Sequence, residues 1–443
     1  MRPYIVIQGP VATRSGYGAH TRELVLSLIK EDRYDIELIS LPWGSTPMNA
    51  LDPNDPEHSE ILKRFAKGNI TRKPDIFIQV SIPSEFQPMG KYSIGVTAGF
   101  ETTIIPGEQL EGCNRMDLII TTSEHSKQSI ESSVFNKHDE KTRQKIGEIK
   151  MEKPCEVLFE GLRTHIFNKT SQIGPEIKSE LSDIKDDFCY LFVGHWLNGN
   201  IGHDRKDIGM MIKTFCEAFK RKPSSKRPGL ILKTSSAKFS IIDRDQIQKK
   251  IQQIIAPYGN KAPNIYLLHG DLTDEEMNDL YNHPRVKAMV SFTHGEGFGR
   301  PLLEFSAIGK PVIASNWSGH VDFLKHAVLL PGELMKVDSS AANNWLLKES
   351  EWFRVNYSYA AQVLIDVIDN YKTYQKQAKK QQEYVLNNFT FDHMSELFVK
   401  RIDKALESVP KEMKLNLPKL KKVNSANTSK VKLPKLKKVA NEA

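Results

Sequence analysis

Long apolar runs and paired cysteines are both missing from this chain of 443 residues. No apolar run approaches the roughly 18 residues that a membrane-spanning helix needs, so the sequence argues against a membrane span. The four cysteines lie far apart without a CxxC pair, which disfavours a disulfide framework and a cysteine-bound metal. The N-terminal segment enters a strand-like run without a signal-peptide cleavage region. We therefore expect a cytoplasmic protein with buried thiols.

Net charge is missing from most of the chain. The formal charge is +8, and residues 411–443, with ten lysines and two glutamates, account for all of it. Residues 1–410 hold 52 basic and 52 acidic side chains, so the high pI says little about this body. No Asp-x-Asp pair stands at a predicted strand end, and the DRKD and DRD stretches carry intervening cations. We therefore predict no bound metal.

Strands and helices alternate in two successive rounds, which predicts an α/β fold. The expected strands are 4–8, 36–40, 75–81, 92–100 and 117–122 in the first round, and 188–194, 229–233, 265–269 and 286–292 in the second. Each round is typical of a doubly wound, Rossmann-like domain, and we expect the two domains to face a cleft.

Composition sets the expected boundaries. Apolar content falls near residue 150, and we place a linker at 162–186. The expected parts are a first domain over 1–165, a second over 166–388, a helix over 389–408 crossing back to the first domain, and a disordered lysine-rich tail over 409–443. Helices are also expected at 353–371 and 374–386.

A glycine-containing loop joins the first predicted strand to a helix over 21–30. Gly16 and Gly18 would let backbone N–H groups approach a ligand, and the helix N-terminus would favour an anion. A tight turn without a ligand explains the loop equally well, because a lone glycine loop is a weak signal.

The stretch 291–315 carries the strongest signal. It runs from the end of an apolar strand through a glycine-rich turn into a short helix, and ligands bind outside this edge of parallel sheets. Glu296 in the turn and Glu304 in the first helical turn can then both accept hydrogen bonds from the hydroxyls of one ligand. Glu304 has a second interpretation as an acid that complements the helix dipole, whereas nothing structural requires Glu296.

The segment EGFGRPLLE, residues 296–304, resembles the Glu-x7-Glu motif of retaining glycosyltransferases of the GT-B fold, family 4. SGYGAHTRELV resembles the first glycine loop of that family. Later segments are similar as well: FETTIIPGEQLEGCNRMDLIITTSEHSKQSI, EVLFEGLRTHIFN, GKPVIASNWSGHVDF and FTFDHMSELF. The resemblance covers roughly residues 1–405 with gaps. It implies an enzyme whose first domain lies on the acceptor side and whose second domain binds the nucleotide-sugar.

The resemblance also implies roles for the residues of the window. Glu296 and the amides of Gly297, Phe298 and Gly299 would hold the hydroxyls of the transferred sugar. Glu304 would bind the ribose of the nucleotide.

Other matched residues would bind the diphosphate. Gly16 and Gly18 would lie against it, and Lys206 fits the second of two basic positions that the family uses. Arg205 stands beside Lys206, and Lys233 at the end of its own strand is a further candidate.

Two positions depart from the family pattern. His195 stands where the first basic residue, an arginine, is expected. Many relatives have a histidine where Glu101 stands, although a subset resembles the Phe-Glu-Thr of this chain. Glu101 is therefore either an acceptor contact or a buried acid at a helix start.

The resemblance implies transfer of a hexose or pentose with retention, from a nucleotide-sugar as co-substrate, with a UDP-sugar expected first and no separate cofactor. Charge building on the leaving phosphate calls for preorganised cations and helix-terminal amides. We therefore predict a metal-independent front-side attack in which the phosphate accepts the proton.

The tail contains two near-copies, KLNLPKLKKV at 414–423 and KVKLPKLKKV at 430–439. It is either a solvated arm or a docking motif for a polyanion such as DNA. Some phage glycosyltransferases modify hydroxymethylated DNA bases, so the acceptor could be such a base, in the host cytoplasm if the protein is phage-encoded. Otherwise the acceptor is a glycan, lipid or protein.

Two other functions stay open at this point. One is a GT-B-shaped nucleotide-binding or scaffold protein without turnover, which the missing arginine at His195 supports. The other is a GT-B-fold epimerase or phosphorylase, which the Glu-x7-Glu window disfavours.

Overall fold

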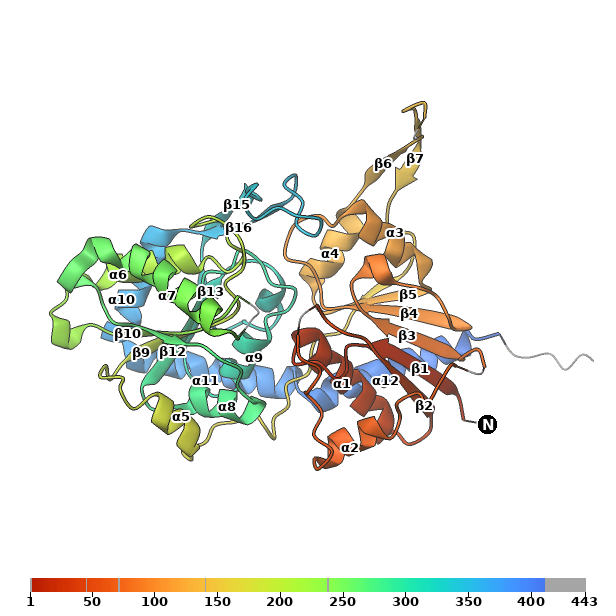
Figure 1. The fold of residues 1–443 in the computed structure, drawn as a ribbon, viewed down its shortest axis with the longest axis horizontal. Helices are drawn as coiled ribbons and strands as arrows, with labels where there is room; N and C mark the ends of the chain where they lie inside the picture. The colour runs from red at the N-terminus through yellow and green to blue at the C-terminus, as the bar shows by residue number, and fades with distance from the viewer. Residues whose placement is uncertain (1, 45, 71, 140, 237–238, 411–443) are drawn as a thin grey trace, which may run out of the picture. The chain divides into compact units, whose positions relative to one another are not determined.

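The computed structural model describes residues 2–44, 46–70, 72–139, 141–236 and 239–410. Up to Val409 the chain forms one unit that contains two six-stranded parallel sheets (Figure 1). The expected lysine-rich tail lies outside the described residues from position 411 onward, so its disorder and its docking role stay predictions.

The first sheet has the strand order β2-β1-β3-β4-β5-β8. Its strands are β1 (Tyr4–Gly9), β2 (Asp35–Ser40), β3 (Ile76–Val80), β4 (Tyr92–Thr97), β5 (Leu118–Thr121) and β8 (Cys155–Val157). The helical elements of this half are α1 (Gly16–Lys30), α2 (Pro56–Leu62), the short η1 (Pro83–Glu85), α3 (Gly107–Arg115) and α4 (Glu124–Ser132). Every residue of β3 is buried, as expected of a continuous apolar strand in a parallel sheet.

The second sheet has the order β11-β10-β9-β12-β13-β14. Its strands are β9 (Cys189–Val193), β10 (Gly229–Lys233), β11 (Ile265–Leu268), β12 (Val286–Ser291), β13 (Val312–Ser315) and β14 (Val328–Leu330). The helical elements of this half are α5 (Pro175–Glu180), α6 (Ile208–Phe219), η2 (Ser224–Lys226), α7 (Ile241–Ile255), η3 (Ala256–Lys261), α8 (Asp274–Asn282), α9 (Arg300–Ser306), η4 (Gly319–Asp322) and α10 (Tyr357–Asp369).

Each sheet reverses its strand order once. The first sheet does so between β1 and β3, and the second between β9 and β12. Loops that leave the carboxyl ends of strands at such a point diverge and leave room for a ligand. The segment between β1 and α1 and the loop that carries Glu296 lie at these two points. The helix expected from residue 21 begins earlier, so Gly16 and Gly18 lie in the first turn of α1 and not in a loop.

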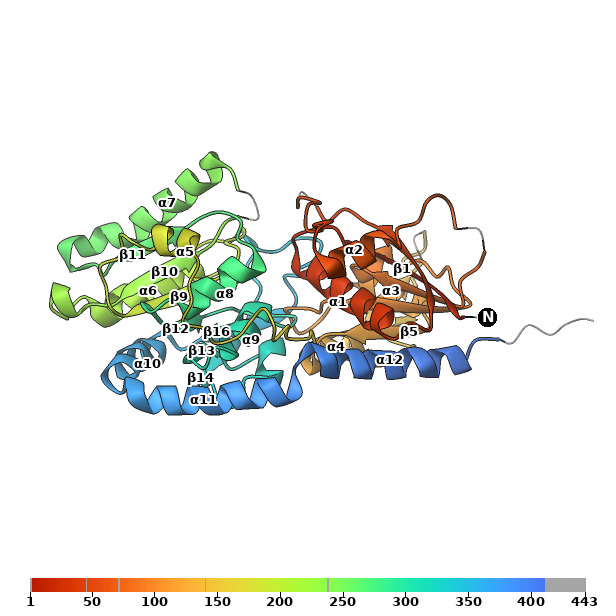
Figure 2. The same cartoon turned by 90° about the horizontal axis from the view of Figure 1, so that it is seen from below.

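Two long helices close the fold. Figure 2 shows α11 (Tyr371–Asn388) and α12 (Phe391–Glu407) running one after the other along the same side of the two sheets. The apolar stripe of α12, which includes Met394, Phe398 and Ile402, joins the core of the first sheet beside Leu24 of α1. The predicted helix that crosses back to the first domain is therefore confirmed.

Two antiparallel hairpins were not expected. One consists of β6 (Phe135–His138) and β7 (Lys145–Ile149), and the other of β15 (Gly332–Lys336) and β16 (Glu351–Val355). The helix expected from residue 353 was wrong at its start, because residues 351–355 pair with β15 and α10 begins at Tyr357.

The segment placed as a linker is folded. Phe167, Ile173 and Ile177 from the stretch 162–186 are buried in the core of the second sheet, and α5 lies within this stretch. Its polar sequence therefore covers the second sheet instead of spanning freely between the two halves.

Candidate active site

The loop after β12 carries Glu296. Gly299 adopts φ 98°, a left-handed conformation that favours glycine, and turns the chain into α9, where Pro301 occupies the first turn. The backbone N–H of Glu296 donates to Ser318 Oγ at 2.9 Å, and its carbonyl oxygen accepts from the N–H of Gly319 at 2.9 Å. Because backbone bonds fix the loop, the Glu296 carboxylate remains available to pair with other groups.

The carboxylate of Glu296 pairs with two cations from the turn after β9. Lys206 Nζ donates to Glu296 Oε1, and Arg205 Nη1 lies 3.4 Å from Glu296 Oε2. The same Arg205 nitrogen lies 3.3 Å from Glu101 Oε1, so Glu101 joins the group. A Cβ at Gly194 would lie 3.3 Å from Lys206 Cε, so this glycine leaves space for the lysine stem. The structure thus brings together four residues that the sequence singled out, and we call them the Glu296 cluster: Glu101, Arg205, Lys206 and Glu296.

Burial and charge oppose each other in this cluster. Burial raises the pKa of Glu296, but the charges of Lys206 and Arg205 outweigh it and lower that pKa to about 2. Burial also lowers the pKa of Lys206, and the charge of Glu296 opposes this shift. The Glu296 carboxylate and the two cations therefore neutralise one another, and this pairing allows all three charges to stay buried.

The glycines of the loop have a packing role. A Cβ at Gly295 would lie 2.0 Å from the carbonyl oxygen of Glu101, and one at Gly297 would lie 2.3 Å from that of Ala98. Thr122 Oγ1 donates to the carbonyl oxygens of Ala98 and Gly297 at 2.8 and 3.4 Å. The loop therefore contacts the chain after β4 directly, and its missing side chains permit this approach.

The sugar-binding role of the Gly297, Phe298 and Gly299 amides stays a prediction. The Phe298 ring is buried against Phe323.

Glu304 lies in a second buried group. Tyr281 Oη donates to its Oε2 at 2.9 Å, and Arg300 Nε lies 3.6 Å from its Oε1. Arg300 also pairs with Glu23 of α1 at 2.8 Å and with Glu160 at 3.2 Å. One arginine therefore serves three carboxylates from three segments, and we call this group the Arg300 cluster: Glu23, Glu160, Arg300 and Glu304.

Burial decides the protonation of Glu304. It raises the pKa of this carboxyl to about 7, although the charge of Arg300 opposes the shift. The folded protein then holds a proton on Glu304 between about pH 4.5 and 7 that the unfolded chain has released. The contribution of this proton to the free energy of unfolding is fully present at a pH below the pKa of Glu304 in the unfolded chain. It is lost as the pH rises through about 7.

We predict that Glu304→Gln gains thermal stability relative to wild type as the pH rises from 5 to 8. Glutamine cannot ionise, so the melting temperature of the variant minus that of wild type should increase, by roughly 3 °C. Thermal unfolding in matched buffers measures this, with the exposed Glu333→Gln as a control expected to show no trend. If the melting temperature of Glu304→Gln minus that of wild type stays constant with pH, Glu304 is already ionised at pH 5.

Of the two glycines in the first turn of α1, only Gly16 has free space around its Cα. A Cβ at Gly16 would meet nothing within 4 Å, whereas one at Gly18 would lie 2.2 Å from the carbonyl oxygen of Thr13. Gly18 therefore serves the packing of its own turn, with Ser15 Oγ accepting from its N–H at 3.0 Å. The diphosphate role of both glycines stays a prediction, and Gly16 has the free space that a ligand needs.

Lys233 and His195 lie near the Glu296 cluster. Burial lowers the pKa of His195 to about 4, helped by the charges of Lys206, Arg205 and Lys233. The imidazole is therefore neutral at pH 7 and does not replace the charge of an arginine.

Lys233 Nζ donates to the carbonyl oxygen of Gly270 at 2.6 Å, and burial lowers the pKa of Lys233. No contact joins it to Glu296, so its role as a donor ligand stays a prediction.

Sequence reasoning missed most of the Arg300 cluster. Arg300 stands four residues before Glu304, so this pair alone could have been found from helical spacing. Glu23 and Glu160 lie far away along the chain, and their partnership with Arg300 depends on the way α1 and α9 meet. His20, fully buried beside Glu23 with 3.7 Å between Nδ1 and Oε2, also gave no sequence signal.

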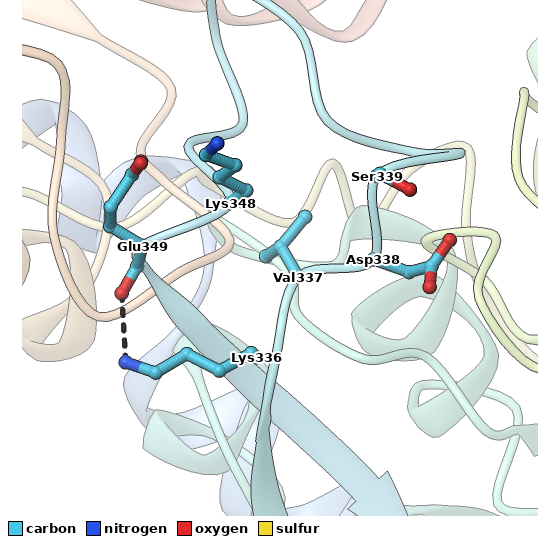
Figure 3. A pocket seen from close by; sticks show the side chains of 6 residues that line it. All are labelled: Lys336, Val337, Asp338, Ser339, Lys348 and Glu349. Atoms are coloured by element: carbon cyan, nitrogen blue, oxygen red, sulfur yellow. Dashed lines mark hydrogen bonds between the residues drawn. The ribbon is translucent and has the colours of Figure 1, made fainter.

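A surface hollow lies away from these two clusters. It measures about 540 Å³ and is lined by side chains next to the β15–β16 hairpin: Lys336, Val337, Asp338, Ser339, Lys348 and Glu349 (Figure 3). Lys336 Nζ donates to the carbonyl oxygen of Glu349 at 2.9 Å, so its cation already has a partner. None of the predicted site residues lines this hollow.

The described residues contain neither a cluster suited to a metal nor a helix suited to a membrane. In the part of the chain that the structure describes, no three or more His, Cys, Asp or Glu side chains gather as a metal would require. Among the described helices, none combines the length and apolar character that crossing a membrane requires.

Comparisons with known proteins agree with the fold. Residues 211–362, about a third of the chain, match the family described as "Glycosyl transferases group 1". No curated protein matches the sequence. The match to residues 211–362 confirms the predicted enzyme class, a glycosyltransferase, at the level of this domain.

Solved structures match nearly the whole chain. Sucrose-phosphate synthase from Thermosynechococcus elongatus has a TM-score of 0.61 at 14% identity, over 92% of this chain and 100% of that chain. HepE from Anabaena in complex with UDP-glucose has a TM-score of 0.57 at 11% identity, over 90% and 99%. The E. coli trehalose-6-phosphate protein bound with UDP-2-fluoro glucose has a TM-score of 0.59 at 11% identity, over 91% and 99%. Identities this low establish the fold alone, and the predicted GT-B fold class is confirmed.

Proposed function

We propose that this protein transfers a sugar from a UDP-sugar to an acceptor hydroxyl with retention of the anomeric configuration and without a metal. The observation that carries the proposal is the Glu296 cluster, in which two largely buried cations and a carboxylate meet at the point where the second sheet reverses its strand order. The group 1 domain over residues 211–362 and the fold shared with proteins that bind UDP-glucose support it.

The proposed donor would exchange partners within the cluster. Its diphosphate would take Lys206 and Arg205, and the hydroxyls of its sugar would take the Glu296 carboxylate. The ion pairs of the cluster would thus be replaced by contacts of similar charge, which reduces the free-energy cost of separating these pairs. Glu304 would accept from the ribose, and Gly16 would allow the backbone of α1 to approach the diphosphate.

The proposed reaction breaks the bond between the anomeric carbon and the oxygen of the β-phosphate. The acceptor oxygen forms its bond to that carbon on the same face, and its proton passes to the departing phosphate oxygen. Negative charge then grows on the phosphate, where Lys206 and Arg205 would stabilise it.

The experiment follows donor turnover by proton NMR with UDP-, GDP- and ADP-sugars. We expect release of UDP from at least one UDP-sugar, a retained anomer in the sugar product, and the same rate with EDTA. An inverted product or a rate abolished by EDTA would contradict the proposed mechanism.

A second candidate function is nucleotide binding without turnover. The neutral His195 favours it, because the position expected to carry an arginine supplies no charge. Arg205 places a second cation next to Lys206, which favours turnover instead. Binding of UDP by calorimetry with no release of UDP from any donor would support the binding protein.

A further inference from the structure

An aromatic pair lies beside the candidate active site in the first half of the chain. Tyr17, near the start of α1, stacks on Trp43, in the loop after β2, with ring centroids 4.0 Å apart and planes inclined by 25°. Both side chains are partly exposed, and Met48 of the same loop is 50% exposed. None of the roles assigned so far uses this pair.

A series of contacts connects the pair to the Glu296 loop. The Tyr17 hydroxyl lies 2.9 Å from Thr97 Oγ1 at the carboxyl end of β4. The next residue, Ala98, contacts Gly297, the neighbour of Glu296. Burial raises the pKa of Tyr17 to about 12, and the charge of Glu101 adds to this shift. The Tyr17 ring therefore lies at the carboxyl end of β4, where the chain meets the Glu296 loop.

The segment that carries Trp43 is acidic. Residues 34–62, which include Trp43, contain no lysine or arginine and six acidic residues. Arg14, whose backbone N–H donates to the carbonyl oxygen of Pro47, pairs its guanidinium with Asp271 at 3.4 Å. A nucleic acid needs lysine or arginine beside its phosphates, so this charge pattern disfavours a DNA acceptor at the pair.

The chemistry of an aromatic pair suits a sugar ring. The C–H face of a pyranose is apolar and packs on an aromatic ring, while its hydroxyls remain free to hydrogen-bond at the edge of the ring. Rigid Tyr and Trp side chains supply such a contact at low entropic cost. A neutral sugar also brings no charge into an acidic segment.

We propose that Tyr17 and Trp43 form the acceptor subsite and hold a neutral sugar ring, so that the acceptor of this transferase is a glycan. The inference rests on the proposed function, and it selects among the acceptors that the sequence left open. A hydroxyl at the edge of the stacked ring would then point toward Glu101 and the Glu296 cluster.

The test begins with wild-type protein. UDP release without an acceptor is measured first, because its absence with every donor would overturn the proposed function together with this inference. Transfer from the active donor is then measured to p-nitrophenyl glucosides, galactosides and mannosides of both anomers, and to a duplex oligonucleotide that contains 5-hydroxymethylcytosine. We expect transfer to at least one glycoside and none to the oligonucleotide.

Three variants locate the subsite. Trp43→Ala should raise KM for the accepted glycoside about tenfold, in line with the value of one aromatic stacking contact, and Trp43→Phe should raise it less. Trp345→Ala removes a tryptophan that is 49% exposed elsewhere and should keep the wild-type KM. Donor turnover without any glycoside transfer, transfer to the oligonucleotide, or an unchanged KM in Trp43→Ala would each overturn the inference and leave the proposed function standing.

Discussion

Replacing Lys206 with methionine is expected to lower kcat for sugar transfer by about 10²–10³-fold. Lys206 lies in a buried position with its ammonium on Glu296, so water does not screen its charge. The proposed reaction builds negative charge on the departing phosphate, and a buried cation stabilises that charge far more than an exposed one does. Methionine keeps most of the volume and removes the charge.

A double variant separates this role from a structural one. Lys206→Met leaves Glu296 buried with only Arg205, at 3.4 Å, as a partner, so the single variant should also lose stability. In Lys206→Met/Glu296→Gln neither charge of the pair remains, and the melting temperature should return toward the wild-type value. We expect kcat of this double variant to stay well below that of Glu296→Gln alone, because the proposed phosphate contact is still missing.

The control is Lys222→Ala, which removes a cation that pairs with Asp369 at 2.9 Å at the end of α10. Its kcat should equal that of wild type. If the double variant has the same kcat as Glu296→Gln along with a restored melting temperature, Lys206 serves only to neutralise Glu296, and its proposed role on the phosphate is wrong.

Local sequence pattern was sufficient for nine strands of the two parallel sheets, β1 to β5 and β9 to β12, and for the loop that carries Glu296. An apolar run followed by glycines and Pro301 specifies a strand, a tight turn and a helix start through backbone preferences alone. The approach of Lys206 to Glu296 could also be expected, because both follow neighbouring strands, β9 and β12, at the same sheet edge.

The remaining parts of the site depend on contacts between distant segments. The Gly297 amide was expected to face a ligand, yet the missing side chains of Gly295 and Gly297 are required by the chain at Ala98 and Glu101. A glycine pattern cannot distinguish close approach to a ligand from close approach to another part of the same protein. The same limit applies to the β15–β16 hairpin, whose strand β16 lay in a segment with an apolar pattern that also suits a helix.

Replacing Arg300 with methionine is expected to be the most destabilising single change in the site. Burial raises the pKa of Glu23, but the charge of Arg300 outweighs it and lowers that pKa to about 2. Without Arg300, the carboxylates of Glu23, Glu160 and Glu304 would remain together with no arginine between them. Removing one partner of a buried ion pair typically costs about 3–5 kcal/mol, and we expect a loss of this size at pH 8.

The pH dependence identifies the cause of that loss. In Arg300→Met the three buried carboxyls should have raised pKa values. The folded variant then holds protons that its unfolded chain releases, so its free energy of unfolding falls as the pH rises. The urea midpoint of the variant should therefore lie closer to that of wild type at pH 5 than at pH 8. Arg401→Met is the matched control, because the two arginine side chains are similarly exposed (19% and 16%) and Arg401 pairs with a single carboxylate, Glu156. Equal losses at the two pH values, or a loss no larger than that of the control, would mean that the three carboxyls do not depend on Arg300 for their charge.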